Sequence, residues 1–141
     1  MEFGGNTSCY EVRCGDALVI LDGGTGLRLL GQDLLKEMPI EAWMFFSHVH
    51  WDHIQGFPFF APAFMPDFRL NIHCTKDAKS ILERQMQTPF FPVGLDVMAA
   101  TPRIAHRREL RMDELQAGIE TPNRQARLNH LLHQLLDEGR R

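Results

Sequence analysis

Short apolar runs separated by turn residues recur through most of this chain. Runs of β-branched and apolar residues between glycine, asparagine or aspartate are typical of strands. The pattern predicts strands at residues 9–14, 17–23, 42–47 and 69–74, with weaker candidates at 103–110 and 124–129. The run AWMFFS at 42–47 is almost entirely apolar, which indicates a strand buried on both faces.

Leucines at helical spacing predict helices between these strands. One set follows the second strand and comes before Pro39: Leu27, Leu30, Leu34 and Leu35. A second helix is expected at 76–87. In the tail, one face of an amphipathic helix is formed by Leu128, Leu131, Leu132, Leu135 and Leu136, with Gly139 as its stop. Strands and helices alternate, so we expect the α/β class with a mixed sheet and flanking helices.

Composition narrows the choice of partners. The net charge of −3 argues against a nucleic-acid interface, and the basic stretch 106–111 is interpreted as a solvated face. No apolar run is long enough to span a membrane, so no membrane partner is expected. The three cysteines are odd in number and form no CxxC motif, which favours reduced thiols in a cytoplasmic protein. For Cys9 and Cys74, burial is a more common role than metal binding.

The stretch FSHVHWDHIQG at 46–56 carries the clearest chemical signal. It holds three of the chain's 7 histidines and one aspartate in the pattern His-x-His-x-Asp-His: His48, His50, Asp52 and His53. The stretch directly follows the predicted buried strand at 42–47. The four side chains are therefore expected on a loop that leaves a rigid scaffold, where reactive groups are commonly presented.

The spacing of this motif suits the binding of divalent metals. His48 and His50 project to the same side of an extended segment, so both can reach one ion. Asp52 and His53 follow as the chain curls into a helical turn, from which both can face a second ion. Imidazole and carboxylate together accept zinc, manganese or iron. Two ions held close together lower the pKa of a bridging water and stabilise the oxygens of a displacement.

Two ligands for each metal are too few, because a catalytic zinc normally takes three protein ligands and a water. His130 stands at the end of a strand-like run and is the best further candidate, and His133 follows it. His73 lies within a predicted strand and His106 stands beside arginines, so a structural role is expected for both.

This motif and its surroundings resemble the metallo-β-lactamase-fold superfamily of metal-dependent hydrolases. The stretches GGNTSCYEV, LVILDGGTGLRLLG and SHVHWDHIQGFPFF look like the branch that includes ribonuclease Z and cyclic-phosphate or cyclic-nucleotide phosphodiesterases. The likeness extends over about residues 4–130. It implies a metallo-β-lactamase-like αββα sandwich, of which this chain carries the N-terminal half. The implied organisation is a partial domain at 1–130 and a divergent helical tail at 131–141.

The resemblance also implies a set of metal ligands for two zinc ions, with manganese or iron as alternatives. The first ion would be bound by His48, His50 and His130. The second would be bound by Asp52 and His53. The implied activity is hydrolysis of phosphodiester bonds, in a small-molecule or nucleotide substrate, through a metal-bound hydroxide. Lactam, thioester and other ester substrates remain alternatives, because the same hydroxide attacks carbonyl carbon.

Two aspartates have further roles by the same resemblance. Asp52 is the candidate catalytic residue, since it also carries a proton in the phosphodiesterase-like members. Asp22, in LDGGTG, would hold the histidine loop by hydrogen bonds and fix the orientation of the rings. A simple turn residue before Gly23 is the alternative for Asp22. A glycine-rich segment at 4–8 is a weaker candidate for donating backbone N–H groups to a phosphate.

The chain departs from the family after His130. The family continues there into a second half that carries a bridging aspartate and a final histidine, whereas this chain reads LLHQLLDEGRR. We therefore expect a domain shortened at both ends. The alternative function is a catalytically inactive metal-binding fragment. The inner face of a single sheet would also need cover, from the tail helix or from another copy of the chain in a homo-oligomer.

Phenylalanine is concentrated beside the motif. Seven of the ten phenylalanines lie between residues 57 and 91, interspersed with prolines. Core packing is the favoured interpretation of this cluster. A wall that faces the substrate, or an oligomer contact beside the metals, is the alternative.

Overall fold

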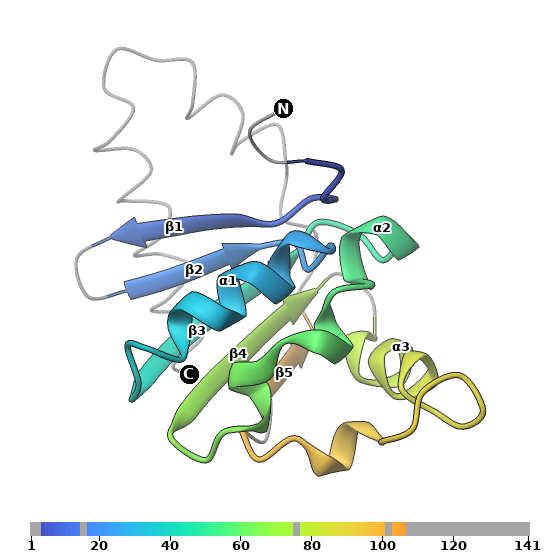
Figure 1. The fold of residues 1–141 in the computed structure, drawn as a ribbon. Helices are drawn as coiled ribbons and strands as arrows, with labels where there is room; N and C mark the ends of the chain where they lie inside the picture. Colours follow the sequence, from blue (N-terminus) through green and yellow to red (C-terminus); the bar gives the residue numbers. More distant parts are fainter. Residues whose placement is uncertain (1–3, 15–16, 75–76, 101–102, 107–141) are drawn as a thin grey trace. The chain divides into compact units, whose positions relative to one another are not determined.

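The computed structural model describes residues 4–14, 17–74, 77–100 and 103–106, which form one mixed sheet with helices, as predicted (Figure 1). The strands in chain order are β1 Tyr10–Cys14, β2 Ala17–Leu21, β3 Ile40–Phe46, β4 Phe68–Cys74 and β5 Arg103–His106. The helices are α1 Gly26–Leu34, α2 Trp51–Ile54 and α3 Ala78–Gln85, with short 3-10 turns η1 Phe57–Phe59, η2 Ala61–Phe64 and η3 Leu95–Val97. The predicted strand at 124–129 and the predicted tail helix lie outside the described residues.

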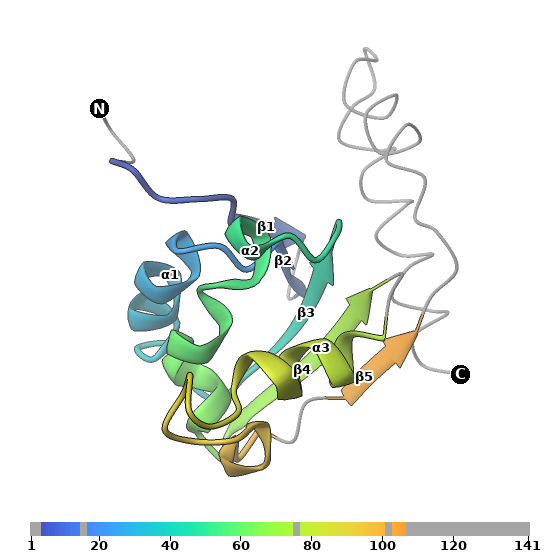
Figure 2. The same cartoon turned by 90° about the vertical axis from the view of Figure 1, so that its right-hand side faces the viewer.

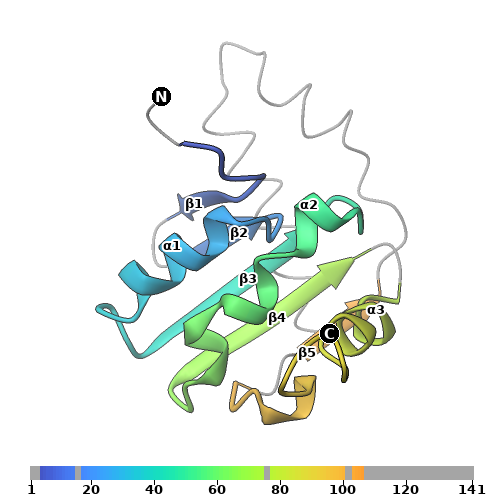
Figure 3. The same cartoon turned by 45° about the vertical axis from the view of Figure 1, so that its right-hand side comes forward.

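The strands are adjacent in the sheet in the same order as in the chain. β1 pairs with β2 in antiparallel fashion, and β2, β3, β4 and β5 pair in parallel. Each parallel step requires a crossover, and crossovers of this kind are nearly always right-handed. A series of right-handed crossovers that always steps in one direction places its helices on a single face. Figures 2 and 3 show α1, α2 and α3 on the same side of the sheet.

The core lies between the sheet and these helices. Alternate strand residues point into it, as a period of two requires: Leu18 and Ile20, Ala42 and Met44 and Phe46, Leu70 and Ile72. From the helical side, Leu27, Leu34 and Leu82 are at most 1% exposed. Each such side chain contributes roughly 1.5–3 kcal/mol through burial, so this layer fixes the sheet against the helices.

The other face of the sheet carries Val19, Trp43, Phe45 and His73, which alternate with the core residues. β3 is buried continuously from Ala42 to Phe46, as its unbroken apolar run predicts. Within the ranges described, the chain has one sheet, so the two-sheet sandwich stays a prediction. No helix of these ranges is long and apolar enough to cross a membrane.

Some local expectations were wrong or incomplete. Leu35 is one of the four leucines whose spacing predicts the first helix, but it follows the last residue of α1 and is 38% exposed. The apolar stretch after the motif forms η1 and η2, since its prolines limit helical hydrogen bonding to single turns. Three of the seven clustered phenylalanines, Phe57, Phe60 and Phe68, are in the core at 0–1% exposure, and Phe64 and Phe91 pack against it partly buried. Phe59 is 57% exposed and packs edge-on against Phe91.

Candidate metal centre

The histidine loop, defined here as residues 47–53, leaves the carboxyl end of β3 and runs into α2. Carboxyl ends of parallel strands form the edge where open α/β sheets bind ligands. His50 has an extended backbone, with φ −64° and ψ 153°, and it directly precedes the helical turn. His48 therefore lies on the approach to the turn, and Asp52 and His53 lie within it.

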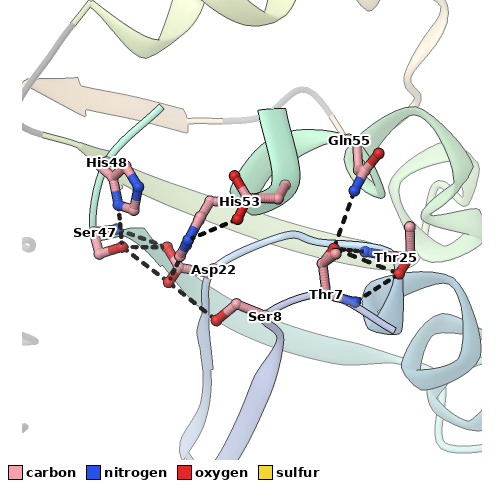
Figure 4. A network of polar contacts seen from close by, with 9 residues as sticks. Thr7, Ser8, Asp22, Thr25, Ser47, His48, His53 and Gln55 are labelled. Atoms are coloured by element: carbon pink, nitrogen blue, oxygen red, sulfur yellow. Dashed lines mark hydrogen bonds and ion pairs between the residues drawn. The ribbon is translucent and has the colours of Figure 1, made fainter. Parts of the chain in front are cut away.

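Asp22 lies beside the beginning of this loop. Its backbone N–H donates to the carbonyl of Phe45 at 2.9 Å, which places the end of β2 next to the end of β3. Its carboxylate Oδ1 accepts hydrogen bonds from the Ser47 amide and the Ser47 hydroxyl, both at 2.8 Å (Figure 4). Asp22 has a φ of 61°, a left-handed conformation that few residues other than glycine adopt. The strained backbone aims the carboxylate at the histidine loop.

The same carboxylate contacts His53. Nδ1 of His53 lies 2.9 Å from Oδ2 of Asp22, and the two side chains are 20% and 10% exposed. The ring N–H is not well aligned with that oxygen, so the contact is a close electrostatic pair and not a linear hydrogen bond. A carboxylate attracts a ring N–H, and the Asp22 oxygen lies closer to Nδ1, at 2.9 Å, than the Asp52 oxygen lies to Nε2, at 3.4 Å, so the proton is favoured on Nδ1. Nε2 of His53 then keeps its lone pair for a metal.

The second nitrogen of this ring faces Asp52. Nε2 of His53 and Oδ2 of Asp52 are 3.4 Å apart. Two ligand atoms, each about 2.1 Å from a tetrahedral zinc ion, are separated by roughly 3.4 Å. The spacing of these two donors therefore fits one divalent ion, and the pair has the chemistry that zinc, manganese and iron accept.

The three imidazole rings of the loop are neighbours. The ring centroid of His48 lies 4.5 Å from that of His50 and 3.9 Å from that of His53. As the side chains lie, no three His, Cys, Asp or Glu residues of the described ranges are arranged to hold one ion. The contact between His53 and Asp52 supplies two donors, so a third requires rotation of a neighbouring ring or a residue elsewhere. His130, the further ligand expected from the sequence, lies outside the described residues, as does His133.

Glycines bring the Asp22 loop and the histidine loop into direct backbone contact. Gly23 N–H donates to the carbonyl of His53 at 2.7 Å, and Gly56 N–H donates to the carbonyl of Gly23 at 2.8 Å. A Cβ on Gly24 would lie 2.5 Å from the Asp52 carbonyl oxygen, a distance that real Cβ atoms do not show. The two loops therefore approach so closely that glycine is required at this position.

A second network of hydrogen bonds, formed by Thr7, Thr25 and Gln55, joins the same parts of the chain. Thr7 Oγ1 accepts from the Gln55 side chain at 3.1 Å and from the Thr25 amide at 2.9 Å (Figure 4). The Thr7 amide in turn donates to Thr25 Oγ1 at 2.8 Å. This N–H is already satisfied within the chain, so the expectation that residues 4–8 donate to a phosphate is wrong for Thr7.

The other candidate ligands lie away from the loop or are chemically unsuited. Cys74 is 2% exposed and belongs to the core, as expected. Burial, together with the nearby carboxylates of Asp22 and Glu11, raises the pKa of the Cys9 thiol to about 12. A metal binds the thiolate, and the raised pKa disfavours that form of Cys9 before a metal binds. His73 is 3% exposed and stacks on Phe45 at a ring separation of 4.8 Å, on the sheet face opposite the helices.

Sequence reasoning did not assign a role to Ser47, Thr7 or Gln55. Ser47 directly precedes His48 in the motif, so its position was a signal that the hydroxyl lies beside the ligands. Thr7 and Gln55 are 48 residues apart, and no local pattern links them.

Comparison with known proteins adds no assignment to this geometry. No family model, no curated protein and no solved structure matches the chain. The function is therefore proposed from the side chains described above and from the resemblance seen in the sequence.

Proposed function

We propose that this chain is a metal-dependent hydrolase of phosphodiester bonds with a metallo-β-lactamase-like fold. The observation that carries the proposal is the contact of His53 with two carboxylates. One carboxylate, Asp22, lies 2.9 Å from Nδ1, and the other, Asp52, lies 3.4 Å from Nε2. The first orients the ring and the second forms a pair of donors with it, which is the arrangement of an oriented metal ligand.

The residues that would hold the metals are those of the histidine loop. Asp52 and His53 would bind one ion, and His48 and His50 would bind another, with His130 as the further ligand that the sequence resemblance implies. When bound, the metals would make a water molecule acidic near neutral pH and neutralise the phosphoryl oxygens. The donor set is most consistent with zinc, and manganese and iron are alternatives.

The side chains of this site would carry out the proton transfers. His50 is exposed, and the Asp52 side chain is 59% exposed, so the open side of the cluster faces solvent and an incoming substrate. Asp52 accepts the proton of the attacking water as the P–O bond to that water forms. It then returns this proton to the alcohol oxygen that leaves as the second P–O bond breaks. Asp22 keeps the ring of His53 in place during both steps.

A second candidate is metal binding without turnover. The pair formed by Asp52 and His53 supplies two donors, and two donors bind a metal more weakly than the three of a catalytic zinc. This candidate shares the metal with the first one, so only an assay of hydrolysis separates them.

The test combines metal analysis with hydrolysis of bis(p-nitrophenyl) phosphate. The whole chain is loaded with zinc or manganese, freed of excess metal, and assayed for metal content and for release of nitrophenolate. We expect bound metal and turnover in the wild-type chain, and loss of turnover in His50→Ala. The matched control is Gln32→Ala, which removes an exposed polar side chain of α1 that is not part of the loop.

The outcomes distinguish the candidates. Bound metal with turnover that His50→Ala abolishes and Gln32→Ala preserves supports the hydrolase. Bound metal without turnover favours the second candidate, and turnover that survives His50→Ala contradicts the proposed site.

A further inference from the structure

We propose that Ser47 is a positioning residue that selects the tautomer of His48. Its hydroxyl donates to Asp22 and therefore accepts a hydrogen bond from the His48 ring. The hydroxyl would keep the ring proton on Nδ1 of His48 and leave the lone pair on Nε2. The use of Nε2 as a metal ligand rests on the proposed function, whereas the tautomer itself does not.

The Ser47 hydroxyl lies within hydrogen-bonding distance of both Asp22 and His48. Its Oγ lies 2.8 Å from Oδ1 and 2.9 Å from Oδ2 of Asp22, and 3.0 Å from Nδ1 of His48. Figure 4 shows the hydroxyl between the carboxylate and the imidazole ring. All three distances are within the range of hydrogen bonds.

A hydroxyl has one proton to donate and lone pairs to accept with. A carboxylate has no proton, so the contacts with Asp22 require the Ser47 proton to point to the carboxylate. The lone pairs of Oγ then face His48, and the contact at 3.0 Å is a hydrogen bond only if Nδ1 carries the ring proton. The opposite tautomer would turn the Ser47 proton toward Nδ1. It would leave Oγ and the Asp22 oxygens facing each other with lone pairs alone.

Asp22 would in this way set the protonation pattern of two rings. It lies 2.9 Å from Nδ1 of His53 and acts on that ring directly. It acts on His48 through Ser47. Both rings then present Nε2 as the free nitrogen, and their centroids are 3.9 Å apart. A single buried carboxylate thus prepares two neighbouring imidazoles before any metal arrives.

The variant Ser47→Ala removes only the hydroxyl from this arrangement. The Ser47 amide still donates to Asp22 Oδ1 at 2.8 Å, because that bond belongs to the backbone. The contact of His53 with Asp22 also does not involve the hydroxyl. We therefore expect Ser47→Ala to fold, to keep the His53 tautomer, and to lose the preference at His48.

The test is long-range ¹H–¹⁵N NMR of metal-free protein labelled with ¹⁵N-histidine, at a pH that keeps the imidazoles neutral. Protonated and unprotonated ring nitrogens have well-separated ¹⁵N shifts, and a His48→Gln spectrum assigns the His48 signals. The wild-type chain and Ser47→Thr, which retains a hydroxyl, should show His48 protonated on Nδ1. Ser47→Ala should show a mixture or the Nε2–H form. Ser80→Ala, an exposed serine of α3, should match the wild-type spectrum.

The wild-type spectrum is decisive without any variant, since His48 protonated on Nε2 overturns the inference. An unchanged His48 signal in Ser47→Ala also overturns it. In zinc titrations, Ser47→Ala should bind about 10–100-fold more weakly than wild type, with recovery in Ser47→Thr. A wild-type chain that binds zinc but hydrolyses nothing would count against the proposed function and leave the tautomer result standing.

Discussion

Gly56 offers the sharpest test of how the two loops are held together. Its backbone is helical, with φ −80° and ψ −17°, so alanine can adopt the conformation without strain. A Cβ at this position would nevertheless lie far inside 3.0 Å of the Gly24 carbonyl oxygen, closer than any real contact. Gly56→Ala must therefore push the Asp22 loop away from the histidine loop.

The expected loss of stability follows from the contacts at this point. Separation of the loops breaks the hydrogen bonds Gly56 N–H to Gly23 at 2.8 Å and Gly23 N–H to His53 at 2.7 Å. These contribute about 1 kcal/mol each, and the overlap adds about 1–3 kcal/mol. The reduced entropy of the unfolded chain returns about 0.4–1 kcal/mol. The net destabilisation is about 2–5 kcal/mol.

Urea unfolding, followed by circular dichroism and tryptophan fluorescence, measures this difference. The matched control is Gly5→Ala, because no atom lies within 4 Å of a Cβ at Gly5. Gly5→Ala should change the free energy of unfolding by less than about 0.5 kcal/mol. Equal stability of Gly56→Ala and Gly5→Ala would refute the close approach of the two loops.

Three further predictions concern single side chains. Asp22→Asn should weaken zinc binding about 10–100-fold in calorimetric titrations, because an amide cannot accept every bond that the carboxylate accepts, while Asp33→Asn on the surface of α1 should have no effect. Cys9 should react with iodoacetamide at pH 8 about a thousandfold more slowly than an ordinary thiol, because its pKa is raised from 9.0 to about 12. The rate of alkylation should rise with pH up to that value. Rapid alkylation of the folded protein, measured by peptide mass spectrometry, would contradict this. Phe57→Ala should lower the free energy of unfolding by about 3–5 kcal/mol because the side chain is fully buried, and Phe59→Ala by no more than about 1 kcal/mol; similar losses for the two would show that the core is placed wrongly.

The sheet was largely predictable because its strands carry a local signal. The apolar runs of β3 and β2 and the alternation of apolar and polar residues in β4 predict strands from composition and period alone. The prolines after the motif predict that the segment does not form a long helix. Whether this segment forms helical turns or irregular loops depends on the residues that pack against it. Phe57 and Phe60 fill the core beneath η1 and η2, and that packing is set by residues distant in the sequence.

Part of the candidate site could also be predicted from local sequence and part could not. One short segment holds His48, His50, Asp52 and His53, so their proximity could be predicted. The contact of Asp22 with Ser47 depends on the pairing of β2 with β3, which brings residues 25 positions apart within 2.8 Å. The left-handed φ of Asp22 has only a weak sequence signature, because aspartate is enriched in this conformation but most aspartates do not adopt it.

The central claim is that the histidine loop binds a divalent ion through imidazole and carboxylate groups. X-ray absorption at the zinc edge, measured on the whole chain loaded with one equivalent of zinc, tests it most directly. We expect nitrogen and oxygen ligands at about 2.0–2.1 Å, with the multiple scattering of imidazole rings. Sulfur at about 2.3 Å as the main ligand, or zinc that washes off without a defined ligand shell, would contradict it.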